Sequence, residues 1–135
     1  MDWVIGERVG PYRFGQRCSL PAHAERVFSG LMAETELAEG LLRYDVGDGV
    51  EVHLMDGRVE RVFLTRSCSL GGVEMMGLSR DGLVIQLGSF GLEIDDERIG
   101  GLDLVHFDAL EAGAAGVIGA DGVTLMQVFA AFDEE

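Results

Sequence analysis

The stretch LLRYDVGDGVEVHLMDGRVERVFL, Leu41–Leu64, contributes most to the fold that this sequence predicts. It contains two turn signals, Gly47-Asp48-Gly49 and Asp56-Gly57, between runs rich in β-branched and apolar residues. Asp-Gly is a strong hairpin signal, because both residues adopt positive φ angles at little cost. We therefore expect an antiparallel meander of three strands: Leu41–Val46, Val50–Met55 and Arg58–Leu64.

The alternation of residues within these strands predicts a sheet with one buried face. The middle strand places Val50, Val52 and Leu54 on one face and Glu51, His53 and Met55 on the other. In the third strand Val59, Val62 and Leu64 break the strict alternation, which indicates a β-bulge.

The segment VGPYRFGQ, Val9–Gln16, which precedes this meander, has an echo later in the chain. Gly10 and Gly15 enclose four residues, as Gly72 and Gly77 do 62 positions later, and a helix-start signal follows each pair. Ser19 is the expected cap of a helix with apolar positions Leu20, Ala24, Val27, Phe28, Leu31 and Met32. Ser79 is the expected cap of a second, shorter helix with Asp81 in its first turn, apolar residues Leu83, Val84 and Leu87, and an end at Gly88.

A second meander is expected in the carboxy-terminal half. Its predicted strands are Leu102–Phe107, Gly116–Ile118 and Val123–Ala130, and its Asp121-Gly122 turn matches Asp56-Gly57. The predicted fold class is therefore α+β: two tandem copies of strand, helix and three-stranded meander, with the helices packed on one face of an antiparallel sheet. The copies span about 6–67 and about 68–135 and together form a single domain, 1–135.

These motifs carry a resemblance to a known architecture. The segments Val9–Gly15, Ser19–Gly30 and Asp56-Gly57-Arg58-Val59 resemble the helix-plus-meander repeat of the β-lactamase inhibitory proteins and the related BamE/SmpA lipoprotein domain. The resemblance implies a sheet with helices on one side and the other side open for binding a protein. The chain lacks a lipobox, and Met1–Arg8 has neither a basic start nor a long apolar run, so we expect no signal peptide and a cytoplasmic location.

The charge of the chain restricts its partners. The net charge is -14, and all ten basic residues are arginines. Residues 1–67 hold 11 acids and 8 arginines, whereas residues 68–135 hold 13 acids and 2 arginines, so the second half carries a net -11. Such a surface repels phosphate backbones and attracts basic proteins, and no apolar run reaches the length of a membrane span. We expect no direct binding to nucleic acid or to a membrane.

No residue pattern predicts catalysis, a metal or a cofactor. The absence of lysine excludes a Walker lysine and a Schiff base, so the Gly10–Gly15 loop is not a phosphate cradle. Cys18 and His23 are five residues apart, but no second pair has metal-ligand spacing, and Cys18 could form a dyad with His23 or His53 only through long-range folding. Cys18 and Cys68 are expected to be free thiols. The acidic run Glu93–Glu97 lacks a calcium-loop pattern and is expected to be a solvated loop.

The function predicted from the sequence is that of a small acidic, non-catalytic protein-binding domain. In its most specific form it is a bacterial immunity or inhibitor protein that occludes the active site of a basic toxin. Two alternatives remain: a structural or regulatory domain, which could be a homodimer, and an enzyme that uses His53, His106 and nearby acids. The apolar cluster Val73, Met75 and Met76 could form a self-association patch, but burial within a strand is the favoured interpretation. The candidate contacts for a basic partner are Glu93, Asp95, Asp96, Glu97, Asp103 and Asp108, with Phe90 and Phe107 as aromatic anchors.

Overall fold

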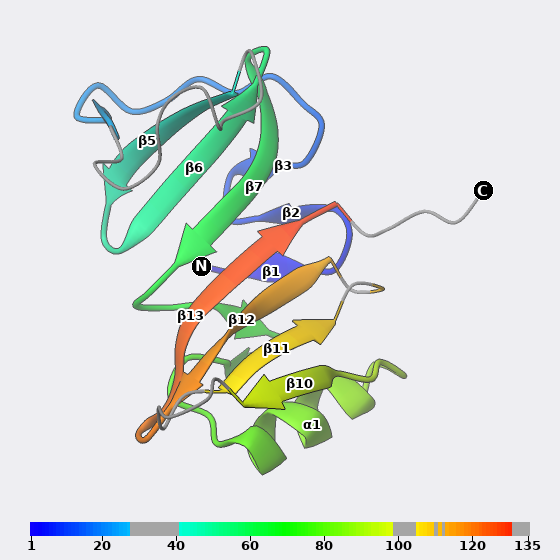
Figure 1. Ribbon diagram of the computed structural model, residues 1–135. Helices are drawn as coiled ribbons and strands as arrows, with labels where there is room; N and C mark the ends of the chain where they lie inside the picture. Colours follow the sequence, from blue (N-terminus) through cyan, green and yellow to red (C-terminus); the bar gives the residue numbers. More distant parts are fainter. Residues whose placement is uncertain (28–40, 99–104, 110, 112, 131–135) are drawn as a thin grey trace.

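The computed structural model describes residues 1–27, 41–98, 105–109, 111 and 113–130, and Figure 1 shows its ribbon. Strands dominate this part of the chain. They form one sheet of eight antiparallel strands and two small sheets, and the described residues contain a single α-helix. The structure is therefore mostly β, and the predicted α+β class is wrong.

The large sheet has the strand order β10-β11-β12-β13-β7-β6-β5-β4. Its strands are β4 (Glu25–Arg26), β5 (Leu41–Gly47), β6 (Val50–Met55), β7 (Arg58–Leu64), β10 (Asp95–Arg98), β11 (Val105–Ala109), β12 (Ala114–Gly119) and β13 (Gly122–Phe129). Each half of the chain contributes four consecutive strands, and the halves meet where β7 pairs with β13.

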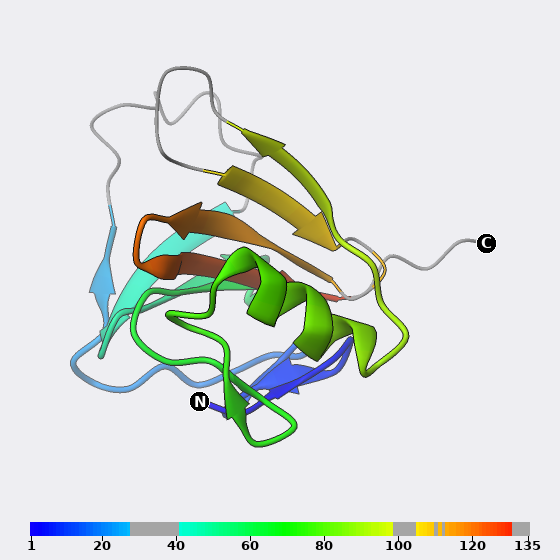
Figure 2. The ribbon, with the colours of Figure 1, turned by 90° about the horizontal axis from the view of Figure 1, so that it is seen from below.

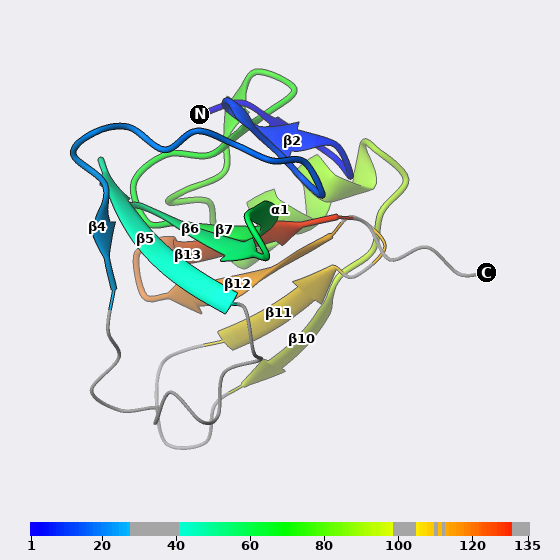
Figure 3. The same ribbon diagram turned by 90° about the horizontal axis from the view of Figure 1, so that it is seen from above.

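The remaining elements cover one side of this sheet. They are β1 (Trp3–Val4), β2 (Arg8–Val9) and β3 (Tyr12–Arg13) in one small sheet, β8 (Ser69–Leu70) and β9 (Val73–Glu74) in the other, and the helix α1 (Arg80–Gly88). Figures 2 and 3 show α1 and the β1–β3 sheet on the same side of the large sheet. Their buried side chains share one core with Val52, Val62 and Val128 of the large sheet.

The first meander is confirmed, since β5, β6 and β7 follow the predicted bounds apart from one extra residue in β5. Its two turns have positive φ at both residues, 54° and 73° at Asp48-Gly49 and 51° and 81° at Asp56-Gly57. This is the backbone of type I′ hairpins, which match the twist of the paired strands. The predicted bulge is also present: His53 pairs with Arg61 but Leu54 pairs with Val59, which leaves Glu60 as the extra residue.

The second meander differs from its prediction in its bounds and its turn. Strand β11 is described from Val105, and the earlier residues 102–104 of the predicted strand lie outside the described part. Gly119 pairs with Gly122, so the turn consists of Ala120 and Asp121 rather than Asp121-Gly122. The acidic run also departs from the predicted loop, because Asp95–Arg98 form the edge strand β10, which pairs with β11.

The predicted first helix is wrong over its described residues. Residues 20–24 lack regular structure, Glu25 and Arg26 pair with Asp45 and Tyr44 of β5, and the Val27 amide donates to the Arg43 carbonyl at 2.9 Å. These backbone groups therefore form hydrogen bonds along the edge of β5 instead of helical hydrogen bonds. Phe28, Leu31 and Met32 of the predicted helix lie outside the described residues. The fold is thus not two helix-plus-meander copies.

The second predicted helix is confirmed as α1. Ser79 is its cap, with a side-chain oxygen that accepts a hydrogen bond from the Gly82 amide at 3.1 Å. Leu83 and Leu87, one turn apart, are fully buried against the sheet. Val84 was expected on the same apolar face, but it is 39% exposed.

Candidate functional site

The large sheet has an inner face, which contributes to the core, and an outer face directed away from it. Inner residues such as Val62, Leu64, Met126 and Val128 are fully buried. Successive side chains of a strand point to opposite sides, so the intervening residues belong to the outer face. The outer face of the three central strands consists of Glu51, His53, Arg61, Phe63, Leu125, Gln127 and Phe129.

A polar network lies at the β5–β6 end of the outer face. The Glu51 carboxylate accepts hydrogen bonds from His53 Nε2 at 2.6 Å and from Arg43 Nε at 3.3 Å. The three side chains are only partly accessible, with exposed fractions of 27%, 11% and 18% for Glu51, His53 and Arg43. These contacts hold the carboxylate in one place on the face.

Burial lowers the pKa of His53, because a protonated imidazole loses its hydration there. The hydrogen bond and charge of Glu51 oppose this shift, whereas Arg43 and Arg61 add to it. The Phe63 ring also packs against the imidazole, with ring centroids 4.6 Å apart. His53 is therefore a neutral donor to Glu51 near pH 7.

A second network marks the seam between the two halves. Arg61 Nη1 donates to Gln127 Oε1, and the Arg61 guanidinium lies over the Phe129 ring, 4.9 Å from its centroid. Strand pairing sets Arg61 opposite Phe129 and Phe63 opposite Gln127. The sequences Arg61-Val62-Phe63 and Gln127-Val128-Phe129 thus meet in antiparallel register, each aromatic ring facing the polar residue of the other half.

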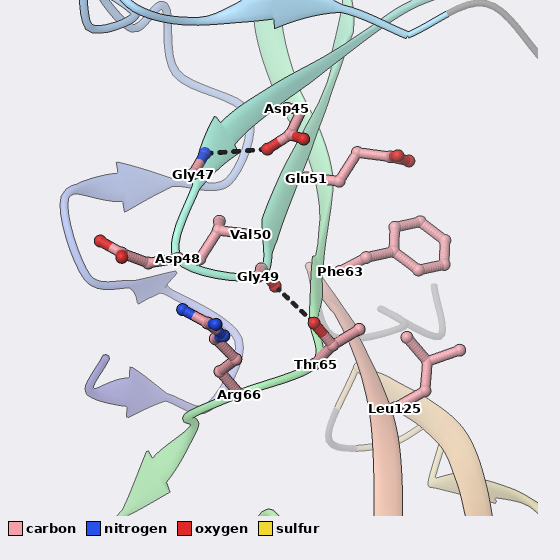
Figure 4. Close-up of a pocket in the computed structure, with 10 residues that line it drawn as sticks. All are labelled: Asp45, Gly47, Asp48, Gly49, Val50, Glu51, Phe63, Thr65, Arg66 and Leu125. Atoms are coloured by element: carbon pink, nitrogen blue, oxygen red, sulfur yellow. Dashed lines mark hydrogen bonds between the residues drawn. The ribbon is translucent and has the colours of Figure 1, made fainter.

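A pocket of about 560 Å³, here called the turn pocket, opens beside the Asp48-Gly49 turn. Its lining combines carboxylates with apolar side chains: Asp45, Asp48, Glu51, Phe63, Thr65, Arg66 and Leu125, with Gly47, Gly49 and Val50. Figure 4 shows Glu51, Phe63 and Leu125 pointing to the same side of the strands. The turn is fixed by hydrogen bonds from the Gly47 amide to Asp45 and from Thr65 Oγ1 to the Gly49 carbonyl, at 2.8 and 3.2 Å.

A second pocket, of about 440 Å³, lies toward the other end of the seam, where Arg61 pairs with Phe129. Arg61, Gln127 and Phe129 line it together with His106 and Asp108 of β11. His106 Nδ1 and Asp108 Oδ2 are 3.9 Å apart, and their side chains are 45% and 40% exposed. The lining also contains Glu60, so this pocket combines two carboxylates with one arginine, whereas the turn pocket combines three carboxylates with one arginine.

The two histidines of the enzyme hypothesis do not share a site. His53 lies on β6 and His106 on β11, with β7, β13 and β12 between them. At about 4.8 Å per strand this separation is roughly 19 Å. Among the described residues, no group of three or more His, Cys, Asp or Glu side chains is arranged to hold a metal ion.

The cysteines are likewise separate from the histidines. Cys18 and Cys68 are both free, and burial raises the pKa of each thiol, that of Cys68 to about 12. His23 Nε2 lies 2.6 Å from the Val46 carbonyl and His53 bonds to Glu51, so both imidazoles have partners other than a thiol.

The candidate contacts from the sequence occupy several settings. Glu93 is exposed, Phe90 is 46% exposed, and Asp108 lies on the outer face. Asp95, Asp96 and Glu97 are in the edge strand β10, and Asp103 lies outside the described residues. Phe107 is fully buried, because its ring packs over Gly116 of the neighbouring strand, which has no side chain. Binding of a partner by these residues remains a prediction.

Sequence reasoning did not identify the turn pocket, although a signal for it existed. The alternation placed Glu51 and His53 on one face, and an Asp56-Gly57 hairpin with the expected bulge in its second strand sets Glu51 opposite Phe63. Leu125 has no such local signal, because it reaches the pocket only through the pairing of β13 with β7, far along the chain.

Comparison with protein-family models, with curated proteins and with solved structures gives no match. In the part of the chain that the structure describes, no helix has the length and apolarity needed to cross a membrane. Any function assigned to the protein therefore rests on the residues of this chain and their geometry.

Proposed function

We propose that the protein is a non-catalytic binding domain that neutralises a basic protein, in the manner of an immunity or inhibitor protein. The observation that carries the proposal is the surplus of carboxylates around the turn pocket, at one end of the outer face. Arg43 pairs with Glu51, whereas Asp45 and Asp48 form no ion pair with an arginine in the described part of the chain. These two carboxylates and the Phe63 ring are left to face a partner.

The overall charge supports the same partner class. A net charge of -14 on 135 residues speeds the encounter with a basic protein and disfavours acidic competitors. A toxin that acts on nucleic acid needs a basic active site to hold phosphates, so an acidic binder is complementary to it. The resemblance to the β-lactamase inhibitory proteins suggested binding by the sheet face opposite the helices. The helix content that the resemblance implied is wrong, but the outer face is still the face of the large sheet opposite the helix α1.

The direct test is binding to the product of the gene next to this one. The two proteins would be co-expressed, purified through a tag on this chain and analysed by size-exclusion chromatography and titration calorimetry. We expect a one-to-one complex that weakens as salt increases, and relief of any growth inhibition that the neighbour causes alone. A neighbour that is not basic, or that does not bind, would contradict the proposal.

Self-association is the second candidate, and the structure changes where it would occur. Met75 of the predicted dimer patch is fully buried, so it is not available for an interface. The exposed large apolar side chains among the described residues are Val73, Val84, Ile85 and Phe90, and Ile85 is 72% exposed. Light scattering over a range of concentrations tests this alternative, and a concentration-independent monomer mass would exclude it.

A further inference from the structure

We propose that the turn pocket receives an arginine side chain of the basic protein partner, and that the residues next to this arginine lie along the outer face toward Phe129. This inference rests on the proposed function and specifies its contact site. Three observations carry it: the composition of the cavity, the arrangement of Glu51 and Phe63, and the distribution of charge along the face.

The cavity combines the two kinds of group that a guanidinium needs. Glu51 and Phe63 are directly opposite each other on β6 and β7, and both point to the same side (Figure 4). Leu125 lies next to them in the lining and provides an apolar surface for the methylene stem. A planar guanidinium stacks on an aromatic ring and bonds a carboxylate at its edge, whereas a compact ammonium does only the second.

The Glu51 carboxylate retains capacity for such a contact. Its Oε2 accepts the short bond from His53, while its Oε1 has only the longer contact of 3.5 Å with Arg43 Nη2. The carboxylate is therefore already oriented, and one of its oxygens is available to a further donor. Orientation before binding reduces the entropy lost when the complex forms.

The charge of the lining favours a cation. Asp45, Asp48 and Glu51 contribute three negative charges, and Arg66 is the one basic residue of the lining. Figure 4 draws the Arg66 side chain away from Phe63, on the other side of the turn. The adjoining outer face supplies Leu125, Gln127 and Phe129, and the cation Arg61 lies over the Phe129 ring. A single arginine at the pocket, followed by apolar and uncharged polar residues along the face, is thus complementary to this surface.

The experiment uses two small probes that differ in one group. Nα-acetyl-arginine amide and its neutral isostere Nα-acetyl-citrulline amide are each titrated into the ¹⁵N-labelled protein at low salt, and amide shifts are recorded by NMR. We expect the arginine probe to shift resonances of Gly49, Glu51, Phe63 and Thr65. The shifts are lost at high salt, and the citrulline probe produces none. Equal shifts with both probes, or shifts elsewhere, would overturn the proposal.

Charge-neutral variants localise the effect. Asp48→Asn and Glu51→Gln each remove one pocket carboxylate, and we expect the arginine probe to bind roughly fivefold more weakly to either. Asp48 is exposed in the turn, and asparagine tolerates its positive φ, so this variant keeps the fold even if Glu51→Gln does not. Asp81→Asn on α1, where the side chain is 92% exposed, is the matched control with the same change in net charge.

The same variants separate the two proposals. If the basic partner binds and only the pocket variants weaken it, both proposals stand. The partner could instead bind every variant with the affinity of the wild type, or Asp81→Asn could weaken its binding as much as Asp48→Asn does. In either case the pocket is not the contact site, although the binding function holds. If the arginine probe binds as expected but no basic partner does, the proposed function fails and the site remains a guanidinium receptor.

Discussion

Near the start of β7 and of β13, a glycine and the residue after it form two backbone hydrogen bonds with one valine, an arrangement here called a backbone clamp. In the first half, the Gly15 amide donates to the Val59 carbonyl at 2.8 Å, and the Val59 amide donates to the Gln16 carbonyl at 2.9 Å. In the second half, the Gly77 amide donates to the Val123 carbonyl at 2.9 Å, and the Val123 amide donates to the Leu78 carbonyl at 2.8 Å. Both glycines have positive φ, 76° and 84°. The glycine echo in the sequence thus corresponds to a real repeated backbone feature.

The segments that come after the two clamps differ in structure. After Gly77 the chain enters α1 at once, because Ser79 caps it and Leu83 and Leu87 bury against the sheet. After Gly15 it runs through residues without regular structure to β4, which pairs with the edge of β5. A shared loop motif therefore does not ensure a shared element, because the next residues form whichever backbone hydrogen bonds the surroundings offer.

The largest effect should come from the glycines of the two Asp-Gly pairs. A Cβ at Gly122 would overlap the Gly77 carbonyl and lie 2.7 Å from the Leu78 carbonyl oxygen, and the φ of Gly122 is 100°. A Cβ at Gly57 would meet only the flexible Arg17 side chain at 3.1 Å. We expect Gly122→Ala to lower the free energy of unfolding by about 3 kcal/mol or more and Gly57→Ala by about 1–2 kcal/mol. Urea unfolding measures both, and equal losses would contradict the comparison.

A smaller effect is expected at the second small hairpin. Glu74 accepts bonds from Ser67 Oγ, the Cys68 amide and the Met76 amide at 2.6, 2.7 and 3.1 Å, whereas the residue 62 positions earlier, in the first glycine segment, is Tyr12. Partial burial tends to raise the pKa of Glu74, but these three bonds outweigh it and hold the pKa below its usual value of 4.5. We expect Glu74→Gln to cost about 0.5–1 kcal/mol of unfolding free energy at pH 7.

The pH dependence identifies the source of the Glu74 effect. The group binds its proton more weakly in the folded state, so its contribution is present above pH 4.5 and decreases as the pH falls through the lower folded value. The difference between wild type and Glu74→Gln should therefore shrink in acid. Glu93→Gln, at an exposed acid, serves as the control, and an equal loss at pH 7 for both variants would count against this account.

The burial of His53 gives the first half a pH response near neutrality. The pKa of His53 is lowered mainly by burial, so the unfolded chain takes up the proton first as the pH falls below 6.5. The free energy of unfolding should then decrease between about pH 7.5 and 5.5, and this decrease should be smaller in His53→Gln. The partly exposed His106 provides the control variant His106→Gln. Urea unfolding at both pH values measures the slopes, and equal flattening by the two variants would refute the assignment.

The reactivities of the two cysteines compare the two halves without any change to the sequence. Both occur in Cys-Ser-Leu, but Cys68 is fully buried with a pKa of about 12, whereas Cys18 is partly exposed. The thiolate is the reactive form, so iodoacetamide at about pH 8 should modify Cys18 first and Cys68 only after denaturation. Mass spectrometry of peptides after timed labelling distinguishes this order, and equal rates in the folded protein would disprove it.

Sequence reasoning succeeded where the deciding interactions are local. Asp48-Gly49 and Asp56-Gly57 determine their own hairpins, and Ser79 with Leu83 and Leu87 determines α1, because every partner lies within a few residues. It failed for the segment around Glu25 and for the acidic strand β10, whose hydrogen bonds go to a neighbouring strand that the local pattern does not reveal. The turn pocket was missed for the same reason, since Leu125 joins it only through the sheet.

The seam between β7 and β13 has a consequence for how the chain folds. Arg61 pairs with Phe129, far along the chain, whereas the pairs within each meander are close in sequence. The entropy of closing so long a loop is lost before its contacts form, so we expect the two meanders to assemble first and the seam last. Gln127→Ala, which removes the side-chain hydrogen bond from Arg61 across the seam, should then accelerate unfolding while leaving the refolding rate nearly unchanged, and a stopped-flow chevron that shows the opposite would place the seam in the folding nucleus.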